Sequence, residues 1–156
     1  MYQLLEELVF THHQHLRNAR IALAWHLGWK PDADGRVKLG MCKKASDLDR
    51  ELAAYDFVIL LRHLFWTDPQ VTDPQRRALL DHELCHADVR LNKYGEPLTD
   101  ERGRTVYRTR RHDIEEFSEV VERNGLWKRD LEDFAAAIQR SPQRELDLGG
   151  PRLVQT

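Results

Sequence analysis

Cysteine is scarce in this chain, which has only Cys42 and Cys85 among its 156 residues. Two cysteines are too few for a disulfide framework, so we expect a reducing, cytoplasmic setting. Long apolar runs are also missing, because stretches such as FVILL fall far below the ~20 residues of a membrane-spanning helix. The N-terminal MYQLLEELVFTHHQ lacks a basic start followed by an apolar run, which argues against a secretory signal.

A strong charge of either sign is absent as well. The formal net charge of -2 gives no general attraction to nucleic acid or to a membrane surface. The content of 41% hydrophobic and 32% charged residues is that of an ordinary globular protein. No internal repeat is visible, so we expect a single domain over residues 1–140. Glycine and proline near the C-terminus predict a flexible tail over residues 141–156.

The spacing of apolar residues predicts a mixture of helices and strands. Thr72 followed by Gln75 is a capping pattern, and Pro74 suits a first helical turn, so a helix is expected to begin there. We predict an α+β fold with helices at 3–27, 46–54, 72–93, 112–125 and 126–140, strands at 36–45 and 56–65, and a β-hairpin at 96–111 around the turn DERG.

The predicted helix 72–93 carries the sequence His82-Glu83-Leu84-Cys85-His86. Residues four apart lie on one face of a helix, so the imidazoles of His82 and His86 can converge on one zinc ion. Glu83 then lies beside the metal, where it can accept a proton from an activated water molecule. The alternative is that the two histidines and the glutamate are structural, but burying them without partners would be costly.

A catalytic zinc ion takes three protein ligands and keeps one open position, so the motif needs a third ligand. His112 follows the predicted hairpin and could be carried back over the motif helix. Glu116 is the alternative, although Asp113 and Glu116 also form a capping arrangement that explains Glu116 without a metal. We therefore favour His112 and keep Glu116 open. Weaker candidates are Glu115, His63, which we expect on a sheet face, and Cys85, which we expect to be a small buried residue.

The stretches LLDHELCHADV and RHDIEEF together resemble the phage-type metallopeptidase family, a relative of the SprT-like zincins. DFVILL before the motif helix is similar as well, so the resemblance covers roughly residues 36–125. It implies a zincin-like fold with an N-terminal helix, a small sheet, the HExxH helix, a hairpin and C-terminal helices. It also implies that His82, His86 and His112 bind zinc and that Glu83 is the base. HDIEEF departs from the relatives' H-G-x-x-F pattern, because Asp113 stands where the glycine would be.

The leading hypothesis is a zinc-dependent peptidase that hydrolyses a peptide or protein substrate, with Glu83 as general base. Strand 56–65 is a possible edge along which an extended substrate pairs. Tyr94 and Tyr107 are candidate hydrogen-bond donors to the scissile carbonyl oxygen, although ordinary packing is favoured for each. Asp81, Asp88 or Asp113 could orient a ligand imidazole, and surface solvation explains them equally well. The alternative function is a non-catalytic, zinc-stabilised domain that binds protein or nucleic acid.

Two further clusters of charged or ligating side chains stand out. THHQH supplies His12, His13 and His15, which we interpret as a surface or helix-packing cluster because no other ligand is evident beside them. The hairpin carries five arginines, for which a solvated face is favoured over a weak nucleic-acid contact. They are Arg102, Arg104, Arg108, Arg110 and Arg111.

Overall fold

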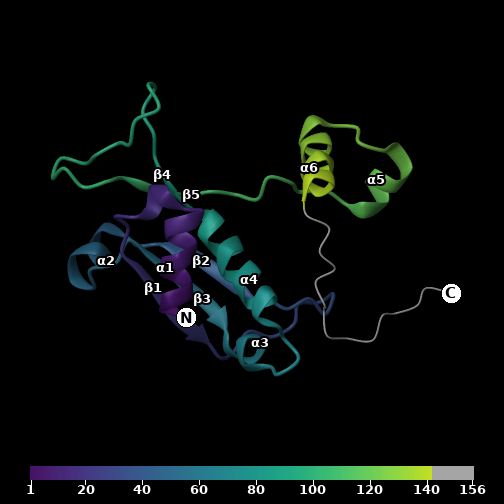
Figure 1. The fold of residues 1–156 in the computed structure, drawn as a ribbon, viewed down its shortest axis with the longest axis horizontal. Coiled ribbons are helices and arrows are strands. Elements are labelled where there is room, and N and C mark those ends of the chain that lie inside the picture. Colours follow the sequence, from purple (N-terminus) through teal and green to yellow (C-terminus); the bar gives the residue numbers. More distant parts are fainter. Residues whose placement is uncertain (142–156) are drawn as a thin grey trace. The chain divides into compact units, whose positions relative to one another are not determined.

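The computed structural model describes residues 1–141, and the rest of the predicted tail, 142–156, lies outside the described residues. Residues 1–110 form one compact unit, and residues 111–141 belong to a second. The mixture of helices with small sheets agrees with the predicted α+β class (Figure 1). None of the helices in residues 1–141 combines the length and apolar character that crossing a bilayer requires.

The first unit contains most of the regular structure. Its helices are α1 (Tyr2–Thr11), α2 (Asp47–Leu52), α3 (His63–Thr67) and α4 (Asp73–His86), with one turn of 3-10 helix at Gln14–Leu16. Its strands are β1 (Ile21–His26), β2 (Gly40–Lys44), β3 (Phe57–Arg62), β4 (Ala87–Val89) and β5 (Tyr107–Thr109). The short helix α2 and strand β2 confirm the predictions for 46–54 and 36–45.

The main sheet has the order β1-β3-β2, with β3 parallel to β1 and antiparallel to β2. Because β3 has a neighbour on each side, the prediction that strand 56–65 offers an exposed edge is wrong. The alternation of side chains along β3 buries Phe57, Ile59 and Leu61 completely. They pack with apolar residues of α1 and α4, so these two helices and the sheet enclose the core (Figure 1).

The N-terminal helix is shorter than predicted. It ends at Thr11, and residues 21–26, which were predicted to continue it, form strand β1. The register of β1 on β3 runs from Ile21 beside Phe57 to His26 beside Arg62. Without β1, the backbone groups along that side of β3 would have no strand partner, so sheet pairing outweighs the roughly helical spacing of the leucines.

Helix α4 begins as predicted and ends earlier than predicted. The side-chain oxygen of Thr72 accepts a hydrogen bond from the Gln75 backbone N–H. The side-chain oxygen of Gln75 in turn accepts one from the Thr72 backbone N–H, which completes a capping box. The helix stops at His86, not near Lys93, because the next three residues pair antiparallel with β5. The predicted DERG turn is present, with Gly103 at φ +73.

A buried carboxylate ties the start of β1 to α2. Asp56 is 3% exposed and accepts hydrogen bonds from Arg20 and Arg50. Burial alone would raise the pKa of Asp56, but the hydrogen bonds from Arg20 and the positive charges of both arginines outweigh burial and lower that pKa.

Asp56→Asn is expected to lower the free energy of unfolding by about 3 kcal/mol at neutral pH, because the largely buried side chain of Arg50 loses its counter-charge. A lowered pKa contributes stability above the unfolded value of 3.8, and this is lost as the pH falls through the folded value. The deficit should therefore shrink at pH 3 in urea denaturation. As a control, Glu7→Gln breaks an exposed pair with Arg77 and should cost ~0.5 kcal/mol or less. An equal loss of unfolding free energy in both variants would contradict the stabilising role assigned to the buried Asp56 carboxylate.

The second unit contains α5 (Ser118–Asn124) and α6 (Arg129–Arg140). Helix α6 agrees with the helix predicted at 126–140, whereas α5 begins six residues later than the predicted start at 112. The Glu116 carboxylate accepts a hydrogen bond from the Phe117 backbone N–H, and Phe117 is extended, with φ -90 and ψ 133. Asp113 therefore does not cap this helix.

Candidate metal site

Helix α4 presents His82 and His86 one turn apart. Their ring centroids are 5.1 Å apart with an interplanar angle of 81°. His86 is the last helical residue, and its Nδ1 lies 2.7 Å from the backbone oxygen of Arg110. A carbonyl only accepts, so Nδ1 carries the proton and Nε2 is the nitrogen that can bind a metal. This backbone carbonyl does the orienting that the sequence had suggested for an aspartate.

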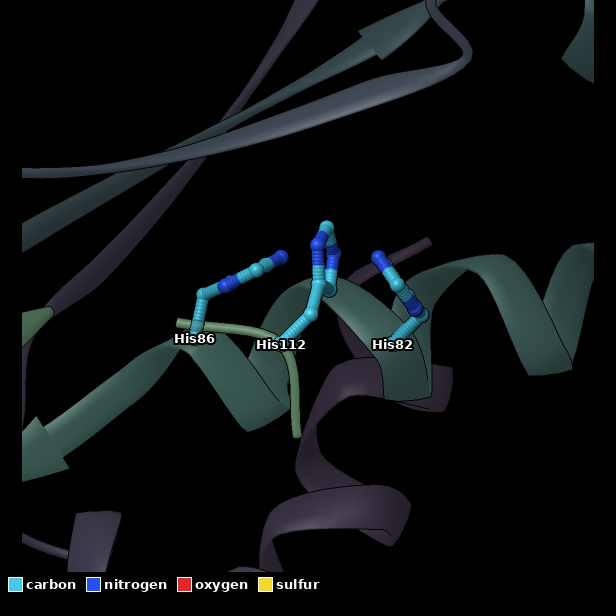
Figure 2. Close-up of side chains that lie close together, drawn as sticks. All are labelled: His82, His86 and His112. Atoms are coloured by element: carbon cyan, nitrogen blue, oxygen red, sulfur yellow. The ribbon is translucent and has the colours of Figure 1, made fainter. Parts of the chain in front are cut away.

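His112 follows a residue that is fixed to the end of α4. The Arg110 backbone N–H donates to the His86 carbonyl over 2.8 Å, in addition to the His86 imidazole bond. Two residues span at most about 7 Å of chain, so this tether keeps His112 within reach of His86. One ligand atom from each of His82, His86 and His112 lies within 4.8 Å of the other two (Figure 2).

Glu83 points from α4 toward strand β2. Its side chain is buried, at 4% exposed, and its Oε2 accepts no hydrogen bond from residues 1–141. A Cβ placed on Gly40 would meet this side chain, at 2.7 Å from Cδ and 2.8 Å from Cγ, with Oε1 closer still. Only glycine leaves room for the Glu83 carboxylate here. A lone glycine within a predicted strand was the available signal, and the sequence reasoning missed it.

Burial raises the pKa of Glu83, because the ionised carboxylate loses contact with water. The charge of His86, the Cys42 backbone N–H and the charge of Lys38 lower the pKa and offset part of this effect. Burial, with a smaller contribution from the negative charge of Glu83, raises the pKa of the Cys42 thiol to about 12. Cys42 is therefore a neutral thiol at physiological pH and a poor metal ligand.

The alternative third ligands have other roles. The Glu116 carboxylate lies 3.4 Å from the Lys128 ammonium, and the Glu115 backbone oxygen accepts a hydrogen bond from the same group. His63 begins α3 and does not lie on a sheet face as predicted; its ring stacks edge-on against Trp25. Among residues 1–141, the groups of possible metal ligands include none of Glu115, Glu116 and His63.

Several other predicted roles give way to packing or pairing. Tyr107 is 6% exposed and packs in the core against Phe57, and Tyr94 is 74% exposed. Asp88 pairs with Arg108, while Asp81 pairs with His13.

Cys85 is exposed, so the prediction that it is buried is wrong. It lies on the solvent-facing side of α4, away from the fully buried Leu80 and Leu84.

The arginines of the hairpin are largely engaged with carboxylates. Arg102 and Arg104 both pair with Glu51, and Arg104 also pairs with Asp100. Arg108 pairs with Asp88, so at least three of the five arginines have acidic partners within the described residues. This pairing favours the structural interpretation, and the nucleic-acid contact receives no support.

Comparison with protein families places most of this chain in a known family. A family model described as "Putative phage metallopeptidase" covers residues 1–139. Searches of curated proteins and of solved structures return no significant match. The family implies a metal ion and a peptide substrate, and the histidine-containing groups of possible ligands agree with a metal ion.

Proposed function

This chain belongs to the putative phage metallopeptidase family, and we propose that it is a zinc-dependent peptidase of the HExxH type. In this proposal His82, His86 and His112 hold the metal, and Glu83 is the general base. The observation that carries it is the buried Glu83 carboxylate, which adjoins two imidazoles on one helix face and whose Oε2 accepts no hydrogen bond in the described part of the chain. A purely structural metal site has no need of such a carboxylate.

The donor set suits zinc. Three neutral imidazole nitrogens with one remaining position form a common arrangement of catalytic zinc. His86 is already oriented for it by the Arg110 carbonyl, and the short tether from Arg110 favours His112 as the third ligand. The Glu116 carboxylate, paired with Lys128, would have to leave that partner to compete.

When bound, zinc supplies Lewis acidity, which polarises a carbonyl and makes water nucleophilic near neutral pH. Glu83 accepts the proton of the attacking water at Oε2 as the water oxygen bonds to the scissile carbonyl carbon. Glu83 then passes this proton to the amide nitrogen as the carbon–nitrogen bond breaks. The close fit of Gly40 and the Cys42 backbone N–H hold the carboxylate in one orientation throughout.

The edge of β2 is the proposed place for the substrate backbone. In the main sheet β2 is an outer strand, and Gly40 at its start adjoins Glu83. An extended peptide that pairs along β2 would carry its carbonyls past the base. This assignment replaces β3, which is the central strand.

Metal analysis of matched variants tests the ligand set. His112→Ala is expected to lose one equivalent of zinc relative to the parent, because two histidines alone bind weakly, whereas Glu116→Ala should keep it. Metal is measured by plasma mass spectrometry after zinc loading and dialysis. Loss in Glu116→Ala alone would reassign the third ligand. A parent chain that binds no zinc would overturn the peptidase proposal.

A further inference from the structure

A second group of metal-ligating side chains lies on another face of α4. Asp81 and Cys85 are four residues apart on this helix, and each directly precedes one of the motif histidines. His13 lies in the segment between α1 and the 3-10 turn, and its side chain contacts Asp81. One ligand atom from each of His13, Asp81 and Cys85 lies within 4.8 Å of the other two. The sequence alone showed no further metal ligand beside the THHQH cluster, residues 11–15. In the folded chain, Asp81 and Cys85 of α4 provide such ligands beside His13.

We propose that His13, Asp81 and Cys85 form a second site for a transition-metal ion of the zinc type. Zinc is borderline soft and accepts imidazole nitrogen, carboxylate oxygen and thiolate sulfur together. Ligands at 2.0–2.3 Å from one ion in a tetrahedron lie roughly 3.3–3.8 Å apart. The observed spacing needs only small side-chain rotations, and the 2.6 Å contact of His13 Nε2 with Asp81 opens by roughly 1 Å as the ion enters.

The environment of these side chains favours a preformed site. His13 is 5% exposed, so its ring is held in place by packing. A cavity of about 450 Å³ opens beside His13 and Cys85, and His12 and His15 also line it. This cavity gives an ion a path from solvent and room for a fourth ligand, either water or a further imidazole. Arg108 lines the cavity too, but its charge is balanced by Asp88.

The charges balance when the site is filled. His13 binds as neutral imidazole through Nε2 and gives up its hydrogen bond with Asp81. The Cys85 thiol releases its proton to solvent as the sulfur–metal bond forms. One carboxylate and one thiolate then neutralise a divalent ion. The filled site would fasten the end of α1 to α4, the helix that carries the proposed catalytic residues, without taking part in hydrolysis.

Cobalt provides a readout that is separate from peptidase activity, because only the second site contains a sulfur ligand. Titration of the metal-free full chain with Co²⁺ is expected to produce a near-ultraviolet thiolate-to-cobalt charge-transfer band. The band should vanish in Cys85→Ser, weaken in His13→Gln, and persist in the matched thiol control Cys42→Ser. It should also persist in His86→Ala, which removes a ligand of the proposed catalytic site.

Alkylation of Cys85 tests the same site with all thiols intact. In His86→Ala, Zn²⁺ is expected to slow the reaction of Cys85 with iodoacetamide at least tenfold, followed by peptide mass spectrometry. Adding His13→Gln to this background should abolish the protection, and far-ultraviolet circular dichroism verifies folding. Absence of the cobalt band in the parent, its loss in Cys42→Ser in place of Cys85→Ser, or zinc-independent alkylation would overturn the second site. None of these results bears on the three-histidine site.

Discussion

Glu83→Gln is expected to remove peptide hydrolysis while leaving zinc bound and the chain folded. Glutamine keeps the shape of the side chain, and its amide oxygen can still accept a hydrogen bond from the Cys42 backbone N–H. It cannot, however, take up a proton from water. Losing a general base typically lowers a rate by about 10²–10⁴-fold. Cleavage of a peptide library, followed by mass spectrometry, gives kcat/KM for the parent and the variant at matched zinc occupancy.

The control for this substitution is Glu6→Gln, which makes the same chemical change on the exposed side of α1 and should leave kcat/KM unchanged.

Burial raises the pKa of Glu83, so ionising this group in the folded chain opposes folding. The metal-free Glu83→Gln chain should therefore be at least as stable as the metal-free parent near neutral pH. Full hydrolysis by folded, zinc-loaded Glu83→Gln would exclude Glu83 as the base.

Local signals in the sequence predicted the parts of the site that lie on one element. The capping box of Thr72 and Gln75 located the start of α4, and the four-residue spacing placed His82 and His86 on one face. The β-branched and aromatic residues of 56–65 predicted a buried strand, which is β3. These features depend on residues close together in the chain, so propensity and periodicity suffice to find them.

Features that depend on distant pairing were not predictable in the same way. The end of α4 at His86 is set by β5, and the strand at residues 21–26 is set by β3. The carbonyl of Arg110 that orients His86 is a backbone group, and every residue type has one. His13 and Asp81 meet only after α1 and α4 have packed together. Gly40 gave a weak signal, because its role depends on the side chain it faces.

Gly40→Ala is the second substitution with a large expected effect. The added Cβ would overlap the buried Glu83 side chain, which packing prevents from moving far. Overpacking of this kind costs about 1–3 kcal/mol of stability. A displacement of ~1 Å in a catalytic group can lower a rate by about 10²-fold. We therefore expect kcat/KM to fall by that factor in the folded, zinc-loaded variant.

Gly28→Ala is the matched control, because among residues 1–141 a Cβ there would meet only the His26 ring, at 4.0 Å. A double-mutant cycle separates positioning from a general effect on β2. In a Glu83→Ala background the overlap disappears, so Gly40→Ala should then cost little stability, and the coupling energy should reach about 1 kcal/mol or more. If Gly40→Ala costs the same stability with and without the Glu83 side chain, Gly40 supports only the strand. If its activity matches that of Gly28→Ala, the Glu83 carboxylate does not depend on the space that Gly40 leaves.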